Sequence, residues 1–285
     1  MTLLQKGDSV GLISCSDGLF PEERAKIEKI ERVLGAAGLQ TRRAHTLFRR
    51  TGTPFSGTPE ERASELMRLF SDNAIRAIFD VSGGDSANQI LPYLDFARIR
   101  RADTPFVGIS DLSVINNAVF ACSGAAAWHY RIKNLAGPFA EQQKRIFRET
   151  FLASAPSPAF DYHWLRGSGM AGVTIGGNIR CFLKLAGTDY FPDPAGKIIF
   201  LEALGGGPAR IASLLAQLDQ LSVFRSCAGV LLGTFTAMEA GKQTPAIERL
   251  VLGITEKYGL PVAKTEQLGH GEDARCLPIG KMISL

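Results

Sequence analysis

The stretch Thr104-Pro-Phe-Val-Gly-Ile-Ser-Asp111 shows most clearly how this chain is built. Residues 106–109 are a short apolar run entered from a proline, which is typical of a buried parallel strand. Ser110 and Asp111 follow at once, and apolar residues at helical spacing occupy 112–122. The pattern therefore predicts a strand, a tight turn and a helix, with a serine hydroxyl at the turn.

A serine in such a turn has two interpretations. At the carboxyl edge of a sheet its hydroxyl would stand beside the first amides of the helix, as in a nucleophile elbow. The local pattern is Gly108-x-Ser110, without the second glycine of the full motif. A serine that only caps the helix leaves the same pattern, and this stretch alone favours the cap.

Composition narrows the class of protein. With 285 residues, 45% hydrophobic and 21% charged, the chain is an ordinary globular sequence, long enough for two domains. The formal charge of +4 is small and no basic run is present, so we expect no nucleic-acid or membrane partner.

The five cysteines are widely spread and never form a CxxC pair. This argues against a disulfide framework or a zinc site, and it favours a reducing compartment. The N-terminus has no basic segment followed by an apolar core, so a cytoplasmic location is predicted.

Strands and helices alternate along the first half of the chain. Apolar runs predict strands at 10–14, 39–44, 75–81 and 106–109, and helical spacing predicts helices at 21–38, 58–70, 88–93 and 112–122. This alternation predicts an α/β fold with a parallel sheet covered by helices on both faces. Ligands of such sheets collect at the carboxyl ends of the strands.

A second polar turn follows the predicted strand at 75–81, namely Ser82-Gly83-Gly84-Asp85-Ser86. The glycine pair would bring bare backbone amides close to a substrate, as an oxyanion hole requires, or would only supply a turn with positive φ. Ser86 is a rival nucleophile, although its place before a helix is typical of a cap. The segment is neither a Walker loop nor a GxGxxG fingerprint.

The second half repeats the alternation after an Ala, Ser and Pro-rich stretch near 153–158. We therefore expect an N-terminal Rossmann-like domain at 1–152, a linker at 153–168 and a smaller mixed α/β domain at 169–285. Residues 172–178 are expected as a second glycine-rich turn. Strands are predicted at 197–203, 228–235, 261–264 and 274–280, and helices at 141–152, 208–221 and 246–259.

Three further features of the sequence could belong to a functional site. Residues 125–137 hold an aromatic and basic cluster that is either a half-buried strand or a pocket lining. Glu202 ends a strongly apolar strand, where an ionised carboxylate is costly unless paired, although it is equally compatible with a residue facing water. His270 lies between two glycines in a turn, where a histidine is usually a surface residue.

Taken in order, these pieces resemble one family, the LD-carboxypeptidase family of serine peptidases. It includes the murein tetrapeptide carboxypeptidases and the microcin C self-immunity peptidase. The matching pieces run over most of the chain: Gly83-Gly84, 91–95, Gly108-Ile109-Ser110-Asp111, Gly176-Gly177-Asn178, Leu201-Glu202, 208–218, 232–235, Gly269-His270-Gly271 and 277–280.

The resemblance implies a Ser-Glu-His triad in which Ser110 is the nucleophile, Glu202 the acid and His270 the base. The amides of Gly84 and Asp111 are candidate oxyanion donors. The resemblance also implies no metal or organic cofactor, a homodimer, and an active site between two domains. The expected reaction releases a terminal D-amino acid from a small peptide, most plainly D-alanine from a murein peptide.

Some residues depart from the murein enzymes. Where these enzymes commonly have Arg before and Tyr after the glycine pair, this chain has Ser82 and Asp85, and Ala203 stands where an acidic residue is frequent. The segment Ser82–Asn88 resembles the microcin-immunity branch of the family, so a peptidyl- or aminoacyl-nucleotide is the alternative substrate.

A non-catalytic two-domain ligand-binding protein is a third, remote possibility. Asp85, Arg131 and Lys133 are candidate substrate-binding residues, the two cations because a terminal carboxylate requires one.

Overall fold

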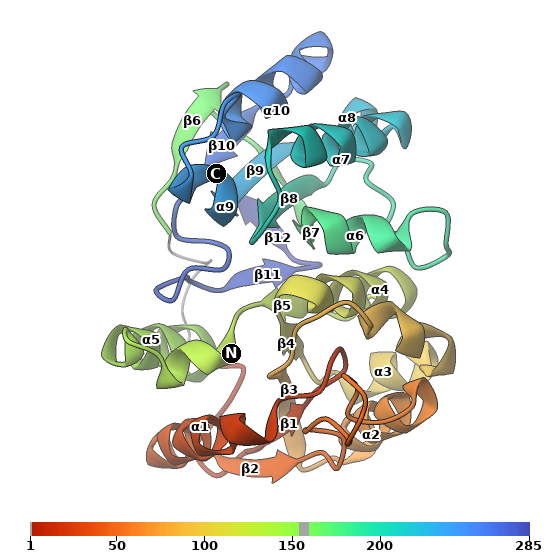
Figure 1. Cartoon of the computed structure of the whole chain (residues 1–285), viewed down its shortest axis with the longest axis vertical. Helices are drawn as coiled ribbons and strands as arrows, with labels where there is room; N and C mark the ends of the chain where they lie inside the picture. Colours follow the sequence, from red (N-terminus) through yellow and green to blue (C-terminus); the bar gives the residue numbers. More distant parts are fainter. Residues whose placement is uncertain (1, 154–159) are drawn as a thin grey trace.

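A computed structural model of the chain describes residues 2–153 and 160–285, and its strands form two six-stranded sheets. The first sheet lies in the lower half of Figure 1. From one edge to the other it contains β11 (Leu277–Ile279), β5 (Ala127–His129), β4 (Phe106–Gly108), β3 (Ile75–Asp80), β1 (Ser9–Ile13) and β2 (Gln40–Arg43). All neighbours are parallel except β11 and β5.

Helices cover both faces of this sheet (Figure 1), because its strands alternate their apolar side chains between two cores. In β3, Ile78 packs with α2 (Pro59–Ser71), α3 (Phe96–Ala102) and α4 (Ser113–Ser123). Its neighbour Phe79 points the other way, towards α1 (Arg24–Ala36), α5 (Ala140–Phe147) and η4 (Ile132–Ala136). Shorter turns are η1 (Pro21–Glu23), η2 (Ala87–Tyr93), η3 (Ser110–Leu112) and η5 (Arg148–Leu152).

The second sheet has a parallel centre and antiparallel edges. Its order is β12 (Met282–Ser284), β7 (Ala171–Asn178), β8 (Ile198–Ala203), β9 (Gly229–Phe235), β10 (Val262–Lys264) and β6 (His163–Arg166). One face packs against α6 (Ile179–Phe182), α7 (Pro208–Gln220), α8 (Val223–Ser226) and α10 (Ile247–Thr255). The remaining short elements are η6 (Leu183–Leu185), α9 (Thr236–Ala240) and η7 (Glu256–Tyr258). The α/β class with two mixed units is thereby confirmed.

One prediction for this half is wrong, because residues 172–178 belong to strand β7 rather than to a turn. Its glycines allow close packing within the sheet. A Cβ on Gly176 would lie 2.2 Å from the carbonyl oxygen of Phe200 on β8, and one on Gly172 would lie 2.7 Å from the carbonyl oxygen of Gly196. β-Branched residues between the glycines favour the extended backbone.

The end of the chain returns to the first sheet. β11 pairs with β5, and its Leu277 and Ile279 pack in one cluster with Phe200 and Leu231 of the second sheet. The interval 153–168, expected as a linker, contains strand β6, while residues 154–159 lie outside the described part. Within 2–153 and 160–285, no helix combines the length and apolar character needed to cross a membrane.

Candidate active site

Ser110 occupies the predicted turn between β4 and the helical residues of η3 and α4. Its φ of 64° is in the left-handed region, which non-glycine residues seldom adopt. The turn is tight, since a Cβ on Gly108 would lie 2.5 Å from Cβ of Leu112. No side-chain cap is formed at η3 or α4, so the interpretation of Ser110 as a helix cap is wrong.

Glu202 and His270 meet directly. Oε2 of Glu202, the penultimate residue of strand β8, lies 2.5 Å from Nδ1 of His270. Their side chains are 0% and 7% exposed. A carboxylate at Nδ1 favours the tautomer with its proton on that nitrogen and leaves Nε2 as a proton acceptor. Nε2 is buried and has no hydrogen-bond partner among the described residues.

The glycines around His270 fix its loop against the strands beneath it. Gly269 has a φ of 133°, and a Cβ there would lie 2.2 Å from Oγ1 of Thr234, so only glycine fits. On the other side, Nδ2 of Asn134 donates to the carbonyl oxygen of Gly271 at 3.0 Å. His270 is therefore held between the two halves of the molecule rather than exposed at the surface.

His129, which the sequence showed only as part of an aromatic cluster, lies beside this pair. It is 1% exposed, and neither ring nitrogen has a partner among the described residues. Burial lowers its pKa to about 4, with the charge of Glu202 opposing this shift and that of His270 adding to it. Its ring packs edge-on against Phe200, at 5.0 Å between centroids.

His129 lies close both to the turn that holds Ser110 and to the pair of Glu202 and His270. His129 on β5 is the register partner of Gly108 on β4, two residues before Ser110. The charges of Glu202 and His270 both affect its pKa. The Ser110 hydroxyl and Nε2 of His270 do not form a hydrogen bond in this structure. Such contacts are often long in a free enzyme and tighten when substrate binds.

Gly84 has a φ of 131°, as the turn interpretation required, and its amide meets no acceptor among the described residues. A Cβ at this position would lie 2.3 Å from the carboxyl carbon of Asp17. The rival Ser86 is buried, and its hydroxyl donates to Oδ1 of Asp17 at 2.8 Å without capping η2. The expectation that Ser86 is a cap is therefore wrong.

Asp111 directly follows Ser110, and its carboxylate connects three other segments of the chain. Oδ2 accepts from the Ser16 hydroxyl at 2.7 Å and from the Ala87 amide at 2.8 Å. Oδ1 pairs with Nζ of Lys184 at 2.5 Å. With no exposed surface, this carboxylate is fully paired within the protein.

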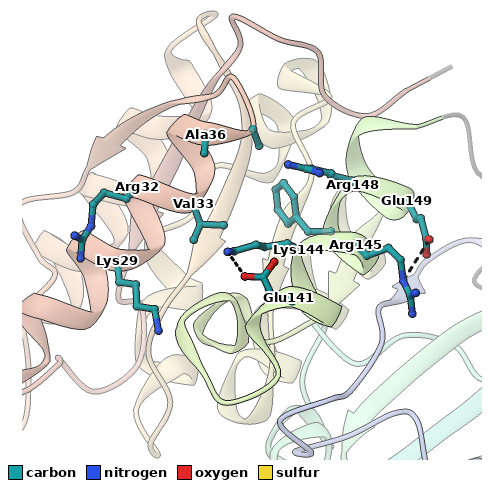
Figure 2. A pocket seen from close by; sticks show the side chains of 11 residues that line it. Lys29, Arg32, Val33, Ala36, Glu141, Lys144, Arg145, Arg148 and Glu149 are labelled. Atoms are coloured by element: carbon teal, nitrogen blue, oxygen red, sulfur yellow. Dashed lines mark hydrogen bonds and ion pairs between the residues drawn. The ribbon is translucent and has the colours of Figure 1, made fainter.

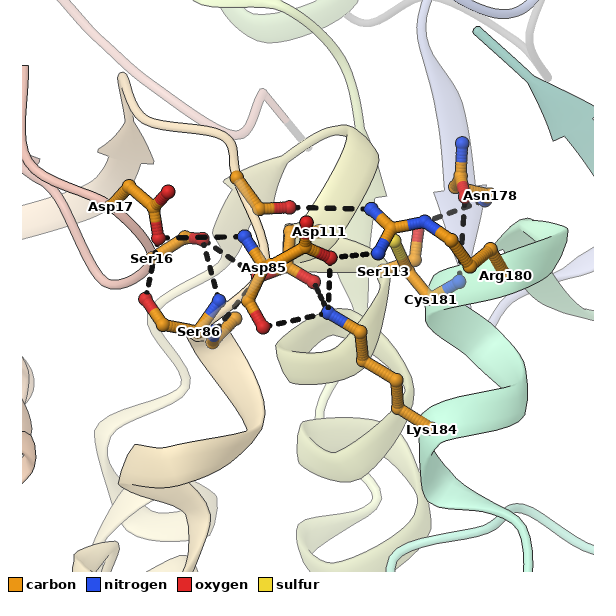
Figure 3. A network of polar contacts seen from close by, with 12 residues as sticks. Ser16, Asp17, Asp85, Ser86, Asp111, Ser113, Asn178, Arg180, Cys181 and Lys184 are labelled. Atoms are coloured by element: carbon orange, nitrogen blue, oxygen red, sulfur yellow. Dashed lines mark hydrogen bonds and ion pairs between the residues drawn. The ribbon is translucent and has the colours of Figure 1, made fainter. Parts of the chain in front are cut away.

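Two cations of the second half reach across to the glycine turn (Figure 3). Arg180 on α6 pairs with the carboxylate of Asp85 and donates to the carbonyl oxygen of Gly84 at 3.3 Å. Lys184 on η6 donates to the Asp85 carbonyl oxygen at 2.8 Å. The sequence analysis missed both residues. Their positions shortly after the carboxyl end of β7 were the available signal, because ligands of parallel sheets bind at the carboxyl ends of the strands.

The other two candidate cations are placed differently. Lys133 forms an ion pair with Glu23 at 3.2 Å, and burial lowers its pKa despite that partner. Arg131 begins the turn η4 beside Tyr130. Within the described residues, neither side chain forms a hydrogen bond or an ion pair with Ser110, Glu202 or His270.

A groove of about 650 Å³ lies elsewhere, between α1 and α5 (Figure 2). Its charged lining residues include Lys29, Arg32, Lys144 and Glu141, with an ion pair between the last two. None of the candidate site residues lines it, so the chemistry of this protein is not centred there.

Comparisons with known proteins agree with this arrangement. Residues 10–130 match the model of the LD-carboxypeptidase N-terminal domain, and residues 171–285 match that of the C-terminal domain. A murein tetrapeptide carboxypeptidase of Pseudomonas aeruginosa is 30% identical, over 81% of this chain and 78% of that protein. A probable murein peptide carboxypeptidase of Bacillus subtilis is 25% identical, over 99% and 90%.

Solved structures share the fold. An MccF-like protein from Bacillus anthracis superposes with a TM-score of 0.89 at 23% identity, covering 99% of this chain and 94% of that one. The microcin C7 self-immunity protein MccF in complex with aspartyl sulfamoyl adenosine gives a TM-score of 0.83 at 21% identity, with coverages of 99% and 94%.

Proposed function

Because the chain belongs to the LD-carboxypeptidase family and is thus a carboxypeptidase hydrolase, we propose that it cleaves the amide bond between an L-centre and a terminal D-amino acid. The nucleophile is Ser110, the base His270 and the acid Glu202. The observation that carries this assignment is the buried 2.5 Å contact between Glu202 and Nδ1 of His270, which leaves Nε2 without a hydrogen-bond partner in the described part of the chain.

In the proposed reaction, Oγ of Ser110 attacks the scissile carbonyl carbon while Nε2 of His270 takes the hydroxyl proton. The amides of Gly84 and Asp111 donate to the oxyanion, and loss of one such donor typically costs about 10²–10³ in turnover. His270 then gives its proton to the leaving amine of the D-amino acid. Water, deprotonated by the same nitrogen, hydrolyses the acyl-enzyme and restores Ser110.

The proposed substrate is a murein tetrapeptide that ends in D-alanine, supported by the names of the Pseudomonas and Bacillus relatives. A cytoplasmic location is proposed because all five cysteines are free, as in proteins of reducing compartments.

We also propose a homodimer. Light scattering at micromolar concentration would then give twice the chain mass of 30.8 kDa, and the chain mass alone would contradict it.

Ser110→Ala tests the proposal most directly. The variant is expected to release no D-alanine from the tetrapeptide, while its thermal unfolding stays close to that of the unchanged protein. A fluorophosphonate should label the unchanged protein once, on a peptide containing Ser110 and not Ser86. Full activity of the variant would rule out the triad, and turnover without any adduct at Ser110 would also count against it.

A second candidate function is hydrolysis of a peptidyl- or aminoacyl-nucleotide. It is favoured by the structural likeness to MccF, which has been solved with aspartyl sulfamoyl adenosine, and by the Ser82–Asn88 segment. Parallel assays with the tetrapeptide and with an aminoacyl sulfamoyl adenosine separate the two. Binding of either ligand without turnover and without covalent labelling would instead favour a non-catalytic binding protein.

A further inference from the structure

Asp85 is an exposed carboxylate with an unusually complete set of partners. It directly follows Gly84, and its side chain is 71% exposed. Arg180 pairs with its Oδ1, and Lys184 donates to the same oxygen at 3.2 Å and to its carbonyl oxygen at 2.8 Å (Figure 3). A negative group is thus already bound by two cations next to the candidate oxyanion hole.

The two cations are not equivalent. Lys184 is 18% exposed and also neutralises the fully buried Asp111, so releasing it would leave a buried carboxylate unpaired. Arg180 is 33% exposed, and within the described residues the only hydrogen-bond and ion-pair partners of its side chain are the Asp85 carboxylate and the Gly84 carbonyl oxygen. An exposed ion pair of this kind contributes little stability, so Arg180 can exchange its partner at small cost.

Arg180 lies close to the place expected for the terminal carboxylate of a carboxypeptidase substrate. In such a substrate the terminal carboxylate lies one residue beyond the scissile carbonyl, roughly 3.8 Å along the chain. In the protein, the candidate oxyanion donor is the amide of Gly84, and Arg180 donates to the carbonyl oxygen of that same residue. The guanidinium is therefore bound to the residue that supplies this candidate donor.

On the premise of the proposed carboxypeptidase function, we propose that Arg180 binds the terminal carboxylate of the substrate. In the free protein the carboxylate of Asp85 occupies this place, and it moves aside when substrate enters. A planar guanidinium can hold a carboxylate through two parallel hydrogen bonds, which fixes its orientation as well as its charge. Arg180 then selects free C-termini, and Asp85 weakens binding by competing for it.

The test compares a murein tetrapeptide ending in D-alanine with the same peptide ending in D-alaninamide. Arg180→Gln should raise KM for the acid by about tenfold to a hundredfold, the range expected for a charge-assisted hydrogen bond, and leave KM for the amide unchanged. Arg180→Lys should recover part of the preference for the acid. Asp85→Asn should lower KM for the acid by up to about fivefold, because the internal competitor is gone.

Arg43→Gln is the matched control. Arg43 is 34% exposed and pairs with Glu31 at the outer edge of the first sheet, so its loss should leave the preference for the acid intact. An unchanged acid-to-amide ratio in a folded, active Arg180→Gln protein would overturn the inference and leave the proposed function standing. If the unchanged protein hydrolyses neither peptide, the proposed function is wrong and this inference is wrong with it.

Discussion

At the scale of single residues, the acid of the candidate triad is the most demanding position. Glu202 has no exposed surface, and Oε1 has no hydrogen-bond partner among the described residues, so its charge is stabilised chiefly through His270. Glu202→Gln keeps the shape but presents an amide to Nδ1, which permits the wrong tautomer. We expect kcat to fall by about 10³–10⁴ with KM nearly unchanged.

Steady-state kinetics on the tetrapeptide measures this effect. Glu65→Gln is a suitable control, because Glu65 is also a largely buried glutamate, but it lies on α2 and its partner is Arg68. A Glu202→Gln protein that is folded and retains more than about a tenth of its kcat would contradict the role of Glu202 as the acid.

His129 predicts how stability depends on pH. Burial lowers its pKa from 6.5 to about 4. At pH values between these two, His129 is protonated in the unfolded chain and neutral in the folded chain. Folding stability must therefore fall as pH decreases from 6.5 to about 4. At roughly 1.4 kcal/mol per pH unit the loss amounts to about 3 kcal/mol.

Urea denaturation of the unchanged protein and of His129→Phe, at several pH values across this window, isolates the effect. Carboxylates titrate in both proteins, so the relevant quantity is the difference between their free energies of unfolding. This difference should shift in favour of the variant as pH falls. Parallel curves would show that His129 takes up its proton equally well in the folded state.

Site residues that follow predicted strands could be identified from the sequence. Residues whose role depends on neighbours from distant segments could not. Ser110 and Gly84 were found because they follow predicted strands. Arg180 was missed because its meaning depends on Asp85, which is far away in the sequence and close only after both sheets have formed. A cation on a helix otherwise resembles any solvated residue.

At the scale of elements, the carboxyl end of β7 and the start of α4 approach each other unusually closely. Oδ1 of Asn117 accepts from the Gly176 amide at 2.8 Å, and the Ser113 hydroxyl accepts from the Asn178 amide at 2.9 Å. Gly177 lies between them with a φ of 134°, and a Cβ on it would lie 2.4 Å from Oγ of Ser113. These contacts set the distance between Ser110 and the second half.

Gly177→Ala should therefore be more harmful than an ordinary glycine replacement. Backbone strain alone costs about 1–3 kcal/mol, and the overlap with Ser113 adds to it and displaces the helix that follows Ser110. Gly187→Ala is the control, because Gly187 also has a positive φ of 78° but no described residue lies within 4 Å of the added Cβ. Urea denaturation should show a larger loss for Gly177→Ala, with activity lost only in that variant.

Equal losses of stability, or full activity in both alanine variants, would mean that the two elements can move apart freely. The same region shows why element prediction failed at 172–178. Glycine is frequent both in turns and in strands that other backbones approach closely, and only the neighbouring strand β8 distinguishes the two cases.

At the scale of the whole molecule, the sequence predicted two successive units, whereas the structure joins them through the chain end. Strand β11 lies in the first sheet although it follows every strand of the second except β12. No local pattern reveals this return, because a three-residue apolar strand is compatible with either sheet. Its Leu277 and Ile279 share one core with Phe200 and Leu231, so neither sheet is complete without the other.

This arrangement predicts that both halves unfold together. The chain has two tryptophans, Trp128 in the first sheet and Trp164 in the second, so Trp164→Phe and Trp128→Phe each leave one local reporter. In each variant, urea unfolding followed by fluorescence should coincide with unfolding followed by far-UV circular dichroism, which reports all elements. Because β11 and its core connect the sheets, loss of one removes packing from the other. A fluorescence midpoint clearly separated from the dichroism midpoint in either variant would show instead that the halves are independent folding units, and that the site between them can open without global unfolding.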